Sequence, residues 1–98
     1  LLTSKLDEST ELATAIQDSL VSGLATKYTK INDLGVKEAP FYVLIGAQMP
    51  SILVEIGFIS NAVEEKRLRS TTYRTQVAQH ILDGVRRYID ATRYAYQR

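Results

Sequence analysis

An apolar residue recurs at every fourth position from about residue 7 to residue 24. The repeated positions are Leu12, Ile16, Leu20 and Leu24. This spacing places them on one face of a helix, so we predict an amphipathic helix over residues 7–24. Asp7 or Ser9 is a candidate cap for its start. Residues 27–39 carry Asn32-Asp33, Gly35 and Lys37-Glu38, which predicts a loop or an irregular connection.

Two short runs after this loop have the composition of β-strands. Residues 41–45 (Phe-Tyr-Val-Leu-Ile) lie between a proline and a glycine, and so do residues 52–56 (Ile-Leu-Val-Glu-Ile). Both runs are apolar almost throughout, as expected for strands that are covered on both faces. The connection over residues 46–51 is too short for a crossover helix, so the two strands need not be parallel neighbours.

The last third of the chain has helical signals. Asn61 followed by Glu64 fits a capping box, with Asn61 as the N-cap of a short helix that ends near Ser70. A longer helix begins at Thr71 or Thr72 and runs to residue 91 or beyond. Its apolar positions are Val77, Ile81, Val85, Tyr88 and Ile89. The predicted order is therefore helix, strand, strand, short helix, long helix, which is an α/β arrangement of helices packed on a twisted sheet.

Length and composition narrow the possibilities. The chain has 98 residues, which suits one small domain or part of a larger one, and it begins with Leu rather than Met. Two strands alone make a poor sheet, so we expect the chain to be a fragment of a larger domain. The formal net charge of +1 gives no electrostatic case for nucleic acid or an anionic membrane. Without Cys, disulfides and thiolate metal sites are excluded.

One charged residue stands in an unusual place. Glu55 lies within the most apolar window of the chain, near the end of the second predicted strand. An ionised carboxylate is costly to bury without partners, and ligands often bind at this end of strands in α/β sheets. Partial burial would also favour general-base chemistry near neutral pH. The structural alternatives are an edge Glu whose carboxylate reaches solvent, or a Glu in a buried salt bridge.

The other polar residues have simpler explanations. His80 is the only histidine and has no second histidine four residues along the helix, so we interpret it as a structural or surface residue. The six tyrosines are scattered and more consistent with helix packing than with sugar stacking. The arginines near the end of the chain are typical of a solvated helix face.

Two stretches together carry a family resemblance. Residues 35–44 (Gly-Val-Lys-Glu-Ala-Pro-Phe-Tyr-Val-Leu) and 49–61 (Met-Pro-Ser-Ile-Leu-Val-Glu-Ile-Gly-Phe-Ile-Ser-Asn) closely resemble the zinc-dependent N-acetylmuramoyl-L-alanine amidases of the cell-division and autolysin type. The resemblance continues through residues 64–65, 68, 73–74 and 81–85, and so covers nearly the whole chain. One departure is Ala62, where the family often has Pro.

The resemblance implies a mechanism for hydrolysing peptidoglycan. These enzymes hold one zinc with two His and one Glu, and the zinc polarises the amide that joins N-acetylmuramic acid to L-alanine and lowers the pKa of its bound water. A second glutamate, in the family segment Val-Glu-x-x-Phe-x-Ser-Asn, acts on that water and then on the leaving amine. Glu55 occupies this position, so the resemblance implies that Glu55 is the catalytic general base and acid.

The resemblance also implies what this chain lacks. The family stretches His-x-Gly-His and Ser-x-His-Ala-Asn, which carry the histidine ligands, are absent. We therefore interpret residues 1–98 as the C-terminal part of a single amidase catalytic domain whose N-terminal half holds the zinc. We expect the isolated chain to bind no zinc at the family site and to be inactive. The substrate implies a location in the cell envelope, either periplasmic or secreted.

Two rival interpretations remain open at this stage. The chain could be part of a non-catalytic amidase-like module that binds the cell wall or a regulator. Alternatively, it is a plain structural piece in which Glu55 pairs with a buried cation.

Overall fold

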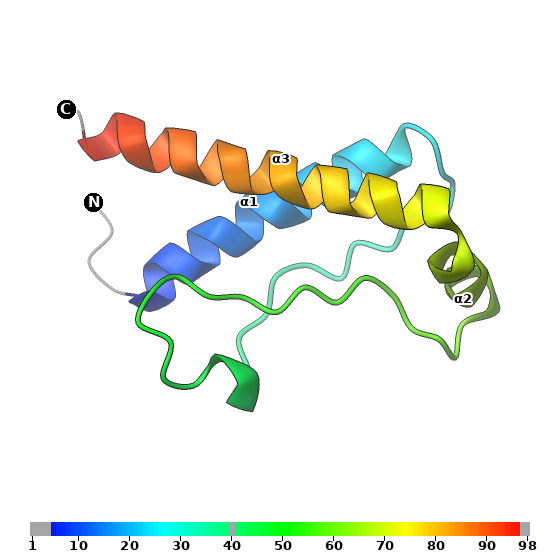
Figure 1. Cartoon of the computed structure of the whole chain (residues 1–98), viewed down its shortest axis with the longest axis horizontal. Helices are drawn as coiled ribbons and strands as arrows, with labels where there is room; N and C mark the ends of the chain where they lie inside the picture. Colours follow the sequence, from blue (N-terminus) through cyan, green and yellow to red (C-terminus); the bar gives the residue numbers. More distant parts are fainter. Residues whose placement is uncertain (1–4, 40, 97–98) are drawn as a thin grey trace.

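A computed structural model describes residues 5–39 and 41–96 of the chain. In chain order, the elements are α1 (Lys5–Ala25), the short 3₁₀ helix η1 (Tyr42–Leu44), α2 (Ala62–Arg69) and α3 (Thr71–Tyr96). The two long helices, α1 and α3, cross each other, and α2 lies beside the first turns of α3 (Figure 1). A long connection, helical only at η1, joins α1 to α2 and runs along one side of the crossed pair.

Helix α1 forms where the four-residue apolar repeat predicts it. It spans Lys5–Ala25, so it begins slightly earlier than the predicted residue 7 and ends one residue after residue 24. Asp7 and Ser9 both lie inside the helix, and neither is its N-cap. The acidic residues in the first turn, Asp7 and Glu8, suit the positive end of the helix dipole.

The small core lies between α1 and α3. Its buried residues are Ile16, Leu20, Leu24, Tyr73 and Val77. The first three belong to the predicted apolar stripe of α1, and the other two lie on one face of α3. Because the helices bury these two faces against each other, the apolar periodicity of each helix accounts for the pairing.

Two glycines let the long helices approach closely. A Cβ atom on Gly84 of α3 would lie 2.5 Å from the Ile16 Cα atom of α1. A Cβ atom on Gly23 of α1 would lie 2.3 Å from the His80 ring of α3. Carbon atoms normally stay about 3.5–4.0 Å apart, so Gly84 has no room for a side chain while the helices keep this separation, whereas at Gly23 the His80 ring would have to move.

The helix starts in the last third agree with the sequence. The Asn61 side chain accepts hydrogen bonds from the Val63 and Glu64 backbone N–H groups, at 3.0 and 3.1 Å. This confirms the N-cap. The reciprocal half of a capping box is missing, because the Asn61 N–H donates to the Phe58 carbonyl instead, at 3.1 Å. Helix α2 ends at Arg69, and α3 continues to residue 96.

The predicted sheet is wrong. Residues 42–44 form η1, residues 52–56 have no regular secondary structure, and the described part of the chain contains no strand. The observed architecture is all-helical, not α/β. The physical reason is that apolar and β-branched side chains favour an extended backbone, whereas a strand also needs a neighbour that accepts and donates backbone hydrogen bonds. No described segment is positioned to be that neighbour.

Candidate functional site

The segment that carries Glu55 is attached to the helices at both ends. At its start, the Ser51 N–H donates a hydrogen bond to the Ser9 hydroxyl of α1, at 3.0 Å. At its end, the Asn61 N–H bonds to the Phe58 carbonyl, and the Asn61 side chain caps α2. Glu55 therefore lies on a short irregular segment that is hydrogen-bonded at both ends.

Neighbouring side chains on this span face opposite ways. Ile52 and Val54 are partly buried and pack against the core between α1 and α3. Leu53 and Glu55 are exposed. Exposure alternates over residues 52–55, but Ile56 is also exposed, so the alternation does not continue past Glu55.

The carboxylate of Glu55 is therefore not buried, in contrast to what its apolar neighbours indicate. Within residues 5–39 and 41–96, Glu55 makes no hydrogen bond and no ion pair, so no buried cation of the described chain pairs with it. Of the arrangements considered from the sequence, its position is that of a carboxylate that reaches solvent.

Gly57 joins this span to α2. Its φ of +154° is a conformation that residues with side chains rarely adopt. A Cβ atom here would be in ordinary contact with Leu68 Cδ1 at 3.4 Å and Glu64 Oε1 at 3.5 Å. The backbone two residues after Glu55 therefore lies against the side chains of α2.

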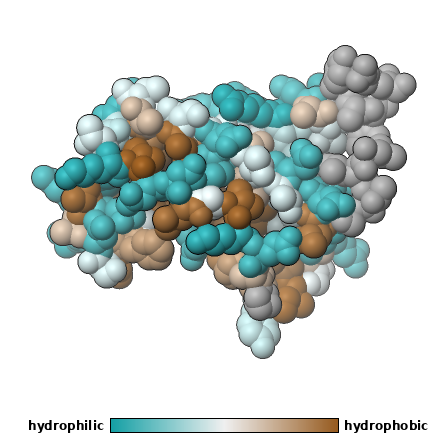
Figure 2. Space-filling view, turned by 180° about the vertical axis from the view of Figure 1, so that it is seen from behind, coloured by the Kyte–Doolittle hydropathy of each residue, from teal (hydrophilic) through white to brown (hydrophobic). Residues whose placement is uncertain are grey.

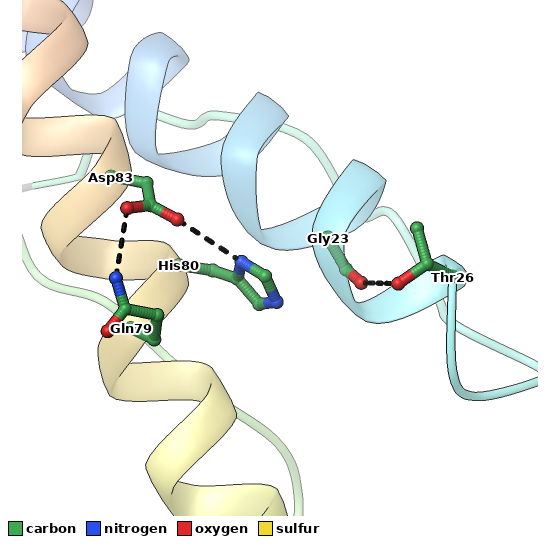
Figure 3. A network of polar contacts seen from close by, with 5 residues as sticks. All are labelled: Gly23, Thr26, Gln79, His80 and Asp83. Atoms are coloured by element: carbon green, nitrogen blue, oxygen red, sulfur yellow. Dashed lines mark hydrogen bonds and ion pairs between the residues drawn. The ribbon is translucent and has the colours of Figure 1, made fainter.

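His80 lies between the two long helices. Its ring points from α3 toward α1 at Gly23 (Figure 3). The His80 Nδ1 atom lies 3.6 Å from an Asp83 carboxylate oxygen, and the other oxygen accepts a hydrogen bond from Gln79 Nε2 at 3.1 Å. No group of three His, Cys, Asp or Glu side chains in the described ranges is arranged to hold a metal ion.

A second cluster of side chains, formed by Tyr28, Arg67 and Tyr73, was not predicted from the sequence. The rings of Tyr28 and Tyr73 meet edge to face with centroids 4.9 Å apart. The Arg67 guanidinium carbon lies 5.5 Å from the Tyr28 centroid and 6.0 Å from that of Tyr73. Arg67 also donates to the Thr29 and Lys30 carbonyls. Residue spacing gave no signal for this cluster, because Tyr28 follows α1 whereas Arg67 and Tyr73 lie far along the chain.

This cluster borders an open hollow of about 600 Å³ next to α2. Burial raises the pKa of the Tyr73 hydroxyl above its ordinary value. Arg67 opposes this shift, whereas Tyr28 and Glu64 add to it. Because Arg67 is already engaged by two carbonyls and two rings, the cluster mainly ties the residue 28–30 turn to α2 and α3, and it offers no nucleophile or metal ligand set.

Comparison with known proteins finds similar sequences among the N-acetylmuramoyl-L-alanine amidases. The model of the N-acetylmuramoyl-L-alanine amidase family (Amidase_3) matches residues 2–87. The uncharacterised protein YqiI of Bacillus subtilis (strain 168) is 43% identical over 84 residues, which are 86% of this chain and 38% of YqiI. The N-acetylmuramoyl-L-alanine amidase LytC of the same organism is 42% identical over 80 residues, which are 82% of this chain and 15% of LytC.

A relative from a second organism is also named as an N-acetylmuramoyl-L-alanine amidase. The N-acetylmuramoyl-L-alanine amidase AmiC of Escherichia coli O6:H1 is 46% identical over 78 residues, which are 74% of this chain and 19% of AmiC. The chain thus spans well under half the length of these three relatives. No solved structure gives a significant match to the chain. No helix among the described residues is long and apolar enough to cross a membrane.

Proposed function

Because the chain belongs to the N-acetylmuramoyl-L-alanine amidase family and covers part of its domain, we propose that it supplies the catalytic glutamate, Glu55, of a peptidoglycan hydrolase. In the complete domain, the reaction is hydrolysis of the amide between N-acetylmuramic acid and L-alanine. The substrate places the enzyme in the cell envelope, either periplasmic or secreted. The match to the family carries this proposal, together with the position of Glu55 in the segment Val54–Asn61.

The surroundings of Glu55 support its role in proton transfer. Its carboxylate is exposed and makes no hydrogen bond or ion pair with any other described residue. The span that carries it is attached at Ser51 and capped at Asn61. An unpaired carboxylate on an anchored backbone can approach a water molecule and a substrate amide without first breaking an existing contact.

The zinc that the family implies does not fit the residues of this chain. His80 is the only histidine, and it is engaged with Asp83 and packed against Gly23. The described part of the chain holds no group of three or more metal-ligating side chains. The metal would therefore be held by residues outside this chain, and we expect the isolated chain to be inactive.

The role of Glu55 can be written as two proton movements. As general base, its carboxylate takes a proton from the water that attacks the amide carbonyl carbon. As general acid, it then gives that proton to the alanine nitrogen as the carbon–nitrogen bond breaks. The products are a free lactyl carboxylate and a peptide with a free amino terminus, so Glu55 returns to its starting charge.

The test is Glu55→Gln in a complete amidase domain that contains this sequence. We expect turnover of purified peptidoglycan to fall by about 10²–10⁴-fold, because the amide is similar in shape but cannot accept the proton. Released stem peptides would be measured by mass spectrometry. Circular dichroism and metal analysis would establish that the variant is folded and loaded with zinc.

Glu38→Gln is the matched control, because Glu38 is also an exposed glutamate without a partner in the described chain. We expect it to keep full activity. If Glu55→Gln lost stability but kept turnover, Glu55 would have a structural role. If the unmodified complete domain bound peptidoglycan without cutting it, the alternative of a non-catalytic amidase-like module that binds the wall or a regulator would replace this proposal.

A further inference from the structure

The hollow next to α2 has the size and the mixed lining of a ligand site. Its wall consists of Tyr28, one side of α2 with its C-cap Ser70, and Tyr73 at the start of α3. Its volume of about 600 Å³ lies within the range of about 300–1,000 Å³ that is usual for ligand pockets. Apolar residues reach the surface at several places in the rear view of the molecule, so apolar exposure alone does not mark one site (Figure 2).

The hollow is separate from the segment that carries Glu55. Residues 62, 63, 66 and 67 of α2 line the hollow. Glu64 and Leu68 of the same helix lie against Gly57, two residues after Glu55. Because successive helical residues are turned by about 100°, these two sets of positions lie on different sides of α2. A ligand in the hollow would therefore leave Glu55 uncovered.

Tyr73 brings an unpaired hydroxyl to this hollow. Its side chain is only 6% exposed, yet its hydroxyl makes no hydrogen bond with any described residue. Within the described chain, the unpaired side-chain atoms that are fully enclosed are Ser19 Oγ and Gln76 Oε1, so the Tyr73 hydroxyl reaches solvent. Because Tyr73 lines the hollow, its hydroxyl opens there. A buried tyrosine usually has a hydrogen-bond partner, and a ligand would supply the one that is missing here.

The charge of the hollow favours an anion. Lys66 is exposed, and its ammonium group has no ion pair or hydrogen bond with any described residue. The charge of Arg67 adds to it, although this guanidinium group already donates to two carbonyls. Among the described residues, no Asp or Glu lines the hollow. Glu64 is close enough to act on Tyr73, but it belongs to the side of α2 that faces Gly57.

The donors suit a carboxylate better than a sugar or a phosphate. The hydroxyls of Tyr28 and Tyr73 are unpaired donors beside the Lys66 ammonium group. One unpaired cation balances the single charge of a carboxylate, whereas a phosphate monoester carries a charge of about −1.5 to −2 at neutral pH. Arg67 lies over both rings, and the rings meet edge to face, so their faces are already used and a stacked sugar is disfavoured.

The apolar part of the wall indicates what is attached to the carboxylate. Ala62 and Val63 line the hollow beside the donors, and the Val63 side chain is 47% exposed. A small apolar side chain next to the carboxylate would cover this surface. A peptide that ends in an apolar residue with a free carboxylate combines both features.

We propose that the hollow next to α2 is a second ligand site, which binds the terminal carboxylate of a peptide. Lys66 provides the charge, and the hydroxyls of Tyr28 and Tyr73 donate hydrogen bonds to the carboxylate oxygens. The apolar side chain of the terminal residue packs on Val63. This site involves neither Glu55 nor a metal, so it does not depend on the proposed function.

The test measures peptide binding to a complete amidase domain that contains this sequence. The probe is the peptide acetyl-Ala-Ala-Val with a free carboxyl terminus, and the comparison is the same peptide with a terminal amide. Lys66→Ala removes the free charge from an exposed position. Lys37→Ala is the matched control, because Lys37 is also an exposed lysine without a partner in the described chain, and it does not line the hollow. Isothermal titration calorimetry would give the dissociation constants.

We expect the peptide with the free carboxylate to bind at least about tenfold more tightly than the amide, because hydrogen bonds to a charged group are the stronger ones. Lys66→Ala should weaken binding of the free peptide by about tenfold or more, and Lys37→Ala by less than about twofold. Tyr28→Phe and Tyr73→Phe keep the rings and should each weaken binding by about three- to tenfold. Circular dichroism would establish that each variant is folded.

Three results would overturn the proposal. They are equal binding, or no binding, of the two peptides, equal effects of Lys66→Ala and Lys37→Ala, and stronger displacement of the peptide by inorganic phosphate than by acetate. Stem peptides released from purified peptidoglycan identify the source of the carboxylate. Displacement of the probe by these stem peptides would assign the site to the cell wall, and its absence would assign the site to a protein terminus. Because the readout is binding, loss of turnover in Glu55→Gln leaves this test unaffected.

Discussion

Replacing Gly84 by Ala tests how the two long helices are held together. Gly84 lies in α3 where that helix crosses α1. An added Cβ atom would lie 2.5 Å from the Ile16 Cα atom, 2.9 Å from Ile16 Cγ1 and 3.0 Å from the Ala15 carbonyl oxygen. Two of these three atoms belong to the backbone of α1, so no change of rotamer can relieve the contact. The helices have to move apart by about 1 Å to restore a normal carbon–carbon distance.

The expected magnitude is a difference between two opposing effects. Overpacking a tight contact costs about 1–3 kcal/mol, and a backbone contact belongs at the upper end of that range. Removing a glycine from the interior of a helix recovers about 1 kcal/mol, because Ala is the better helix former. The net result is a loss of about 1–2 kcal/mol in the free energy of unfolding. For a chain of this size, that loss lowers the Tm by about 5–15 °C.

Urea and thermal unfolding followed by circular dichroism would measure this loss. The control pair is Arg87→Ala and Arg87→Gly, since Arg87 is an exposed residue of the same helix. The difference between these two variants gives the Ala–Gly preference of α3 without any contact to α1. If Gly84→Ala proved as stabilising as that preference alone, the close crossing of α1 and α3 at Gly84 would be refuted.

Three further changes test other parts of the structure. Gly23→Ala should destabilise the chain by about 1 kcal/mol, because its Cβ atom would meet the His80 ring. In a His80→Ala background, the same change should instead stabilise the chain by about 0.5–1 kcal/mol. If a double-mutant cycle showed no such reversal, the contact between Gly23 and His80 would be contradicted. Asn61→Ala should cost about 0.5–2 kcal/mol in urea unfolding because α2 loses its cap, whereas Asn61→Ser should keep most of the stability, and equal losses would argue against capping. Burial raises the pKa of Tyr73 from its ordinary value of 10.0, so its contribution to stability is fully present below about pH 10 and is lost as the pH rises through the raised pKa. Urea unfolding between pH 8 and 11 should therefore show a steeper loss of unfolding free energy in the unmodified chain than in Tyr73→Phe. Parallel pH profiles of the two proteins would contradict this.

The candidate site could be predicted only in part. Glu55 was identified because a charged residue in an apolar run is costly to bury and because the surrounding segment resembles one family. Its apolar neighbours predicted a covered strand, whereas in the structure Glu55 is exposed on a segment that pairs with no other. Which way a side chain faces depends on what lies on each side of the backbone, and this information is not local. The catalytic role of Glu55 therefore stays a prediction.

The Arg67 cluster illustrates the same limit. Arg67, Tyr28 and Tyr73 come together only because α2 folds back beside α3 and the turn after α1. No spacing in the sequence relates these three residues, since a cation–π contact requires proximity in space and no particular separation along the chain.

The sequence by itself determined the helices and the family. The apolar period of α1, the N-cap at Asn61 and the start of α3 after Ser70 are local signals, because a helix satisfies its backbone hydrogen bonds within a few residues. Only the tertiary structure decided that residues 41–45 and 52–56 do not form strands. Their composition favours an extended backbone, but a strand requires a partner at a distance, and the described chain provides none. The same dependence on distant neighbours decided that Glu55 is exposed.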